Sequence, residues 1–148
     1  MDGDPTYVID EYLKQVEIDN KDRRQKLINS GEHQAKAVVF IDQPRDVSRV
    51  FADDSSFFVR GWQISDSETA ELSITIDGRI VSDIDRVKRQ DVYDAYFDEY
   101  VGFMDPKTIG WEFPLKNLQL EKGKHYLEVS CVEKGKTLTK KSVEFEIQ

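Results

Sequence analysis

A tyrosine- and aspartate-rich stretch, residues 89–100 (RQDVYDAYFDEY), holds the side chains best suited to bind a ligand. Sugar recognition needs aromatic faces that stack on C–H surfaces, and carboxylate or guanidinium groups that hydrogen-bond hydroxyls. The stretch supplies both types, and a tryptophan follows it closely. The candidate carbohydrate-binding residues are Arg89, Asp91, Tyr93, Asp94, Tyr96, Tyr100 and Trp111.

The same residues have a structural interpretation. Aromatic side chains of a small domain are more often partly buried than fully exposed, so Tyr96, Phe103 and Trp111 are also candidates for the core. Arg89 and Asp91 are two residues apart, a spacing that cannot form a pair across a helix but can pin the backbone of a turn.

Calcium is a weaker alternative for this stretch. Asp91, Asp94, Asp98 and Glu99 offer enough oxygen atoms, but they lack the alternating spacing and the glycine of the common twelve-residue calcium loop. A solvated acidic face explains them equally simply. We therefore predict neither a metal nor another cofactor.

Catalysis has little support in the sequence. Two carboxylates could serve as the acid and base of a glycosidase, and His33 or His125 as a general base. Neither histidine has a Ser, Cys or Asp partner at a recognisable motif spacing. Cys131 lies on the apolar face of a predicted strand, which favours an inert core thiol. We predict a protein without enzymatic activity.

The charge distribution narrows the range of partners. The 148 residues carry a net charge of −8, and residues 35–115 hold 9 basic and 16 acidic side chains. Such an acidic middle disfavours a nucleic-acid backbone as a partner. No apolar run approaches the roughly 20 residues that a membrane-spanning helix needs, so we expect no membrane insertion. One cysteine excludes a disulfide framework within the chain.

A helix is predicted from Thr6 to about Asn29, begun by Asp4-Pro5 and ended by Asn29-Ser30-Gly31. One stripe on it repeats in alternating steps of four and three, as in a coiled coil, with Arg23 interrupting it. Its candidate oligomerisation residues are Ile9, Leu13, Val16, Asn20 and Leu27. The alternative is a helix that lies against the following domain or links it to another. Residues 1–34 are thus predicted to be a helix and linker, with homo-oligomerisation possible through this stripe.

The rest of the chain, residues 35–148, has the two-residue period of β-strands. Leu72, Ile74 and Ile76 alternate with polar residues, and Asp77-Gly78 predicts a two-residue hairpin turn. A bulge at Gly61 would turn Trp62 and Ile64 to the same side as the apolar residues before them. Another strand is expected to start at residues 101–103. About seven short strands with polar turns predict an all-β antiparallel, Ig-like sandwich preceded by one helix.

Several of these positions together resemble a known bacterial pattern. They are Gly61-Trp62, Ile76-Asp77-Gly78, Arg89-x-Asp91-Val92 with a Tyr shortly after, Gly102-Phe103, and Leu120-x-x-Gly123-x-His125. The pattern, over about residues 37–148, is similar to that of Ig-like β-sandwich domains appended to glycosyltransferases and methyltransferases of cell-surface glycan synthesis. Such domains also occur in phage and surface proteins. Two features depart from the pattern: residues 89–100 carry more acidic side chains than it has, and residues 104–108 differ from it.

The resemblance implies a non-catalytic accessory module that acts on or near carbohydrate within a larger bacterial glycan-assembly protein. It would position that protein on its glycan or on partner subunits, in the cytoplasm or at a membrane surface. The alternative is a phage or surface receptor-binding module that binds host polysaccharide directly, on a virion or cell surface. The resemblance itself assigns no binding residue.

Overall fold

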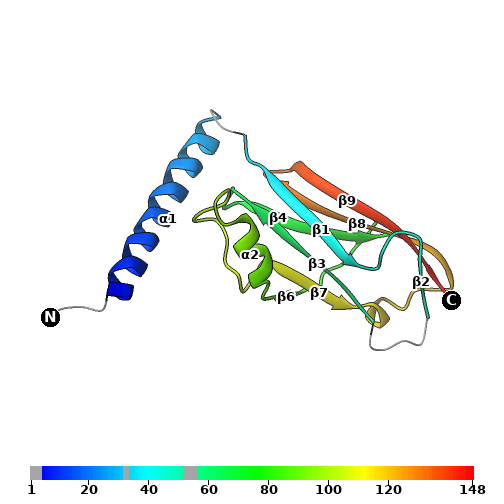
Figure 1. Cartoon of the computed structure of the whole chain (residues 1–148). Coiled ribbons are helices and arrows are strands. Elements are labelled where there is room, and N and C mark those ends of the chain that lie inside the picture. Colours follow the sequence, from blue (N-terminus) through cyan, green and yellow to red (C-terminus); the bar gives the residue numbers. More distant parts are fainter. Residues whose placement is uncertain (1–4, 32–33, 52–56) are drawn as a thin grey trace.

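Two β-sheets packed face to face form the body of the protein, and a long helix stands at one end of them (Figure 1). The computed structural model describes residues 5–31, 34–51 and 57–148, and only the backbone of residues 5–17. The helix, α1, spans Pro5–Ser30. Its predicted extent is confirmed, and Gly31 follows it with a φ of 81°, as a helix-ending glycine does.

The first sheet is antiparallel and has the strand order β1-β3-β7-β6. These strands are β1 (Ala37–Gln43), β3 (Phe58–Ser65), β7 (Gly110–Pro114) and β6 (Asp85–Val87). The second sheet has the order β2-β9-β8-β4-β5, where β2 runs parallel to β9 and the other neighbours are antiparallel. Its strands are β2 (Ser48–Val50), β9 (Lys136–Ile147), β8 (Gly123–Glu133), β4 (Ala70–Ile76) and β5 (Arg79–Ile80).

This arrangement confirms the predicted Ig-like β-sandwich after one helix. The described residues form nine strands, two more than predicted, because β2 and β6 have only three residues each and were not predicted. Two short helices join them, α2 (Gln90–Tyr96) and the 3-10 helix η1 (Leu115–Leu118).

The main core lies between the sheets and follows from strand alternation. Val39, Val59, Ile74, Leu127 and Phe145 are almost completely buried. Removing such side chains from water is the dominant stabilising contribution to a fold of this kind. The predicted inward face of β8, which includes Cys131, is confirmed.

The predicted bulge at Gly61 is wrong. The pairing of β3 with β7 runs without interruption through Gly61, which lies opposite Trp111, and the register shift lies in β1 between Ile41 and Gln43. Strict alternation therefore holds in β3, and Trp62 and Ile64 point away from the main core. They are nevertheless buried, because a second layer covers that side of the sheet.

That second layer consists of α2 and the segment after it. Val92 and Tyr100 pack with Trp62, Ile64 and Ile109 into a second apolar cluster on the outer side of the first sheet. Residues 101–103 form a turn and not the start of a strand, so that prediction was wrong. The backbone N–H of Phe103 donates to the carbonyl oxygen of Tyr100 at 3.0 Å, which closes a turn in place of a strand.

Candidate functional site

The helix α2 carries most of the predicted binding residues, and an arginine anchors its start. The Arg89 side chain donates two hydrogen bonds to Asp91, from Nε to Oδ1 at 3.0 Å and from Nη2 to Oδ2 at 2.9 Å. Its Nη1 donates to Asp42 Oδ2 of β1 at 2.5 Å. The hydrogen bonds from Arg89 are the main reason that the pKa of Asp91 is lowered to about 2, and those to Asp91 and Asp42 raise the pKa of Arg89. The structural interpretation of these two residues therefore agrees with the geometry.

Two of the predicted sugar-binding aromatic residues are buried. Trp111 has 0% of its surface exposed, and its ring stacks near Phe113 with 6.4 Å between centroids. Tyr100 is 2% exposed, and burial, with the nearby carboxylates of Asp66 and Glu99, raises its pKa to about 12. Neither ring can offer a face to a sugar in this structure, so both predictions are corrected: these residues belong to the two cores.

The remaining aromatic residues lie at the surface of α2. Tyr93 and Phe97, one turn apart, are both half-buried, and their ring centroids are 5.5 Å apart. Tyr96 is also half-buried and packs on Trp62 at 5.5 Å. Asp94 is exposed between them and accepts a hydrogen bond from Gln90 at 3.0 Å. The structure thus brings Tyr93, Asp94 and Tyr96 together on one short helix.

Trp62 and Phe40 extend this aromatic surface along the outer side of the sheet. Their rings stack with 5.6 Å between centroids and an interplanar angle of 18°. Phe40 is 41% exposed, with Lys141 Nζ 5.4 Å from its ring centroid. Phe40 was not among the predicted site residues, because residues 37–41 are all apolar and no alternation separates the two faces of β1.

The acidic residues are spread out and do not converge on one point. Asp91 is held by Arg89, and Glu99 lies 3.8 Å from Lys36. No group of three His, Cys, Asp or Glu side chains within the described residues has the arrangement of a metal site. The residues that could hold calcium by composition, Asp91, Asp94, Asp98 and Glu99, thus gain no geometric support.

His125 takes part in a structural contact with a residue far from it in the sequence. Its Nδ1 lies 2.6 Å from Asp77 Oδ2, and its Nε2 lies 2.6 Å from the carbonyl oxygen of Glu121. Both ring nitrogens therefore face acceptors, which suits the doubly protonated ring. Burial alone would lower the pKa of His125, but the hydrogen bonds to Asp77 and Glu121 raise it overall.

Asp77 is held from both sides. It occupies the left-handed region at the start of the β4–β5 turn (φ 52°), confirming the predicted two-residue turn. Its Oδ1 accepts the backbone N–H of Tyr126 at 2.8 Å. Burial would raise its pKa, but the bonds from His125 and Tyr126 lower it overall. The pair ties the β4–β5 hairpin to the start of β8.

We expect this pair to make the stability of the fold depend on pH. A raised His125 pKa adds stability that is complete below the ordinary value of 6.5 and is lost as pH rises through the folded-state pKa. A lowered Asp77 pKa adds stability that is complete above 3.8 and is lost as pH falls through its folded-state pKa. In urea unfolding at a series of pH values, the pair should contribute most to the free energy of unfolding between pH 3.8 and pH 6.5. His125→Gln should flatten the alkaline side of the profile, and equal profiles for wild type and His125→Gln would contradict the role of the pair.

The stripe predicted for self-association is only partly described. The side chains of Ile9, Leu13 and Val16 lie outside the described residues, and Leu27 is half-buried. Asn20, predicted as a member of this stripe, donates from Nδ2 to the carbonyl oxygen of Val101 in the same chain at 2.8 Å. Self-association through the stripe remains a prediction.

The C-terminal half of α1 docks on the sandwich through a different set of residues. Lys21 pairs with Glu68 at 2.7 Å, and Gln25 Oε1 accepts the backbone N–H of Glu68 at 2.9 Å. Arg24 donates to the carbonyl oxygen of Glu99, and Ile28 is buried. The hydrogen bonds and the ion pair lie on polar positions of the helix, which is why an apolar stripe did not reveal them. No described helix is long and apolar enough to cross a membrane.

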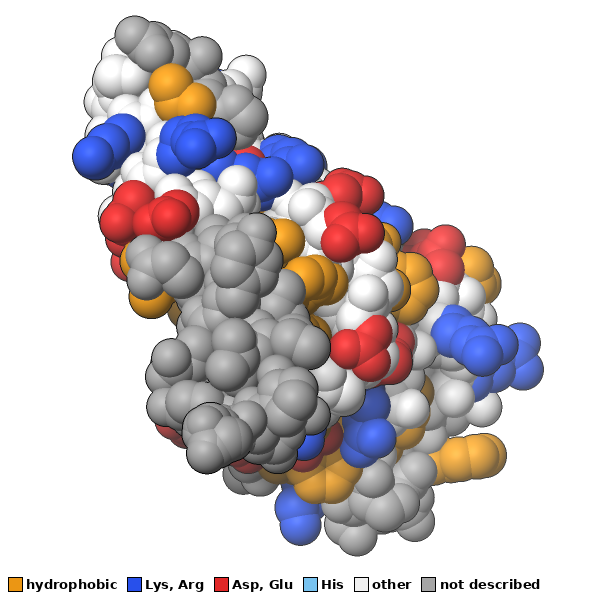
Figure 2. Space-filling model, turned by 60° about the vertical axis from the view of Figure 1, so that its left-hand side comes forward, with side chains coloured by type: hydrophobic (Ala, Val, Ile, Leu, Met, Phe, Trp, Pro, Cys, Tyr) orange, Lys and Arg blue, Asp and Glu red, His pale blue; other side chains and the backbone are white. Residues whose placement is uncertain are grey.

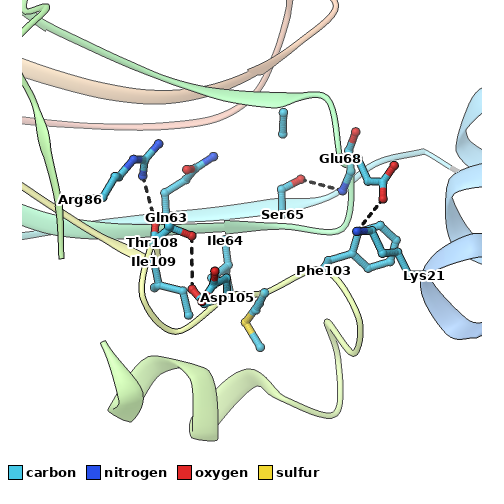
Figure 3. Close-up of a pocket in the computed structure, with 13 residues that line it drawn as sticks. Lys21, Gln63, Ile64, Ser65, Glu68, Arg86, Phe103, Asp105, Thr108 and Ile109 are labelled. Carbon is cyan, nitrogen blue, oxygen red and sulfur yellow. Dashed lines mark hydrogen bonds and ion pairs between the residues drawn. The ribbon is translucent and has the colours of Figure 1, made fainter. Parts of the chain in front are cut away.

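A pocket of about 420 Å³ opens where α1 meets the sandwich (Figure 3). The end of β3, the β3–β4 turn, β6 and the loop before β7 surround it. Its lining includes Lys21, Gln63, Ser65, Ser67, Glu68, Arg86, Phe103, Asp105 and Thr108. None of these residues was among the predicted site residues, because they come from five separate segments of the sequence.

Comparison with known proteins supports the fold. No family model matches the chain, and no curated protein matches its sequence. Among solved structures it resembles an endo-β-1,4-mannanase from Thermotoga petrophila, with a TM-score of 0.50 and 19% identity. That match covers 83% of this chain and 22% of the mannanase chain, so this chain spans about a fifth of its length. A structure of titin Ig tandem domains also matches, over 78% of this chain and 50% of that one, with a TM-score of 0.39 and 9% identity.

Proposed function

We propose that this protein is a non-catalytic, carbohydrate-associated accessory module of a larger bacterial glycan-assembly protein. The observation that carries the proposal is the half-buried aromatic pair of Tyr93 on α2 and Phe97 directly after it, with Asp94 exposed on the same helix. Aromatic faces next to a hydrogen-bond acceptor are the groups that sugar rings require. In the view of Figure 2 the hydrophobic side chains form small areas separated by charged and polar ones, which suits a polar ligand more than a large protein interface.

The support beneath α2 favours binding by a preformed surface. Val92, Tyr96 and Tyr100 hold one side of the segment against Trp62, and Arg89 ties its start to Asp42. A short helix of seven residues is not stable by itself, so this packing must hold it in place. A surface that does not need to be ordered on binding loses less entropy, which favours affinity.

The likeness to part of a mannanase adds an analogy at the level of the fold. It shows that a sandwich of this kind occurs within a carbohydrate-acting protein, and function does not follow from fold alone. The resemblance of residues 37–148 to glycan-assembly accessory domains points the same way. In this proposal α1, docked by its C-terminal half, positions the sandwich relative to other parts of the protein or a second copy.

A glycan array with matched variants tests the proposal. We expect the intact chain to bind a subset of bacterial glycans, and Tyr93→Ala or Phe97→Ala to weaken that binding about tenfold or more, since stacking on a sugar is lost. Tyr126→Ala is the matched control, because Tyr126 is 57% exposed on the opposite sheet. An array without any bound glycan, or equal losses for all three variants, would contradict the proposal.

A further inference from the structure

The pocket beside α1 has the size and the polar lining of a small-ligand site. Its volume of about 420 Å³ falls in the range of roughly 300–1,000 Å³ that small-molecule sites occupy. Figure 3 shows Arg86, Gln63 and Thr108 at one side of it, and Lys21, Glu68 and Phe103 at the other. It is separate from the aromatic surface of α2.

Two cationic side chains line this pocket, Lys21 and Arg86, and among the described residues Arg86 forms no ion pair with an acidic side chain. Among the described residues its single hydrogen bond or ion pair is a long one, from Nη1 to the carbonyl oxygen of Thr108 at 3.3 Å. Lys21, by contrast, pairs with Glu68 at 2.7 Å. Arg86 keeps enough exposed surface for a ligand to reach it, although partial burial of its guanidinium lowers its pKa. A guanidinium has five donors, so most of its capacity is unused here.

The rest of the lining suits a hydroxylated ligand with one negative charge. Ser67 and Thr108 contribute hydroxyl groups, and Phe103 contributes an apolar surface. The Oδ1 atom of Asp105 accepts the backbone N–H of Lys107 at 3.0 Å. The same carboxylate can also accept hydrogen bonds from the hydroxyl groups of a ligand. Its negative charge disfavours a doubly charged phosphate in the same pocket.

We propose that this pocket binds a carboxylate-bearing sugar residue of the uronic-acid class, with Arg86 holding the carboxylate. The planar fork of an arginine matches the two oxygens of a carboxylate, and such pairs are both strong and selective. This inference rests on the proposed association with carbohydrate, to which it adds a second site and a chemical class of ligand.

Titration calorimetry on the intact chain tests the inference with matched ligands. The probes are galacturonate and glucuronate trimers and their methyl esters, which keep the hydroxyl groups and lack the negative charge. We expect at least one acidic trimer to bind about tenfold or more tightly than its ester. Arg86→Gln should abolish that preference, and Arg86→Lys should keep part of it. Arg49→Gln, a change on β2 at the other end of the sandwich, should leave it unchanged.

Amide chemical shifts in the wild-type chain provide a second measurement that needs no variant to fold. Acidic trimers should shift the signals of Ser67, Phe103 and Thr108. Shifts confined to Tyr93 and Phe97, or equal binding of acid and ester, would overturn this inference and keep the proposed function. Absence of any shift or heat with the trimers would also overturn it, and the glycan array would then decide the proposed function separately.

Discussion

Gly61→Ala is expected to lower the free energy of unfolding by about 3 kcal/mol or more, one of the largest effects of a single methyl group in this chain. A Cβ atom on Gly61 would lie 2.0 Å from the carbonyl oxygen of Phe40 and 2.5 Å from the Trp111 ring. The first neighbour is the backbone of the paired strand and the second is a completely buried indole, so neither can move without disturbing the sheet or the core. Urea unfolding followed by circular dichroism measures the loss.

Gly78→Ala is the matched control for this change. Gly78 has a φ of 81° and open space where a Cβ would lie, so alanine there adds only backbone strain, about 1–2 kcal/mol. The two variants thus separate steric exclusion from conformational freedom. Equal losses for both, or a wild-type midpoint for Gly61→Ala, would show that the close contact of Trp111 with β3 is absent in solution.

Trp111→Ala should lower the free energy of unfolding by about 3–5 kcal/mol, which leaves little of the stability of an ordinary domain. Trp111 is completely buried between the sheets and packs over Gly61 and beside Phe113. Its removal would leave a large cavity that the surrounding strands cannot close. The sugar-contact hypothesis makes the opposite prediction, a lost ligand and an unchanged fold.

Thermal unfolding together with tryptophan fluorescence decides between these outcomes for Trp111. Wild-type emission should be dominated by buried indoles, because Trp62 is also largely covered. Tyr126→Ala, which removes an exposed ring from β8, should change the melting temperature little. A Trp111→Ala protein as stable as Tyr126→Ala would contradict the core position of Trp111.

Most residues that carry the resemblance to glycan-assembly domains have a structural role here. Asp77 and His125 meet as a hydrogen-bonded pair, although 48 residues separate them. Arg89 anchors α2, and Gly61 makes room for an indole. These positions therefore stabilise the sandwich and hold α2 in place on it. The surface proposed to contact a ligand lies between them, where the pattern has a tyrosine shortly after Val92 but requires neither Asp94 nor Phe97.

Local sequence patterns predict most of the strands, the turn at Asp77-Gly78 and the long helix. The alternation of Leu72, Ile74 and Ile76 and the Asp77-Gly78 turn are local features, because side chains of a strand alternate with a period of two and a left-handed turn selects its residues. The lone buried thiol of Cys131, whose pKa burial raises, was predicted from the same alternation. The strands β2 and β6, of three residues each, were missed because so short a run has no period.

Packing between distant segments determines which aromatic side chains remain accessible to a ligand. Alternation groups Trp62 with Ile64, but it does not say that α2 covers their side of the sheet. Tyr93 and Tyr100 lie in the same stretch of aromatic and acidic residues. Tyr93 is nevertheless half-buried at the surface, whereas Tyr100 is buried by packing on the sheet. The pocket around Arg86 likewise exists only because α1 docks where β3, β6 and a loop meet. Such contacts join segments far apart in the chain, and their geometry depends on the whole fold, which no local period records.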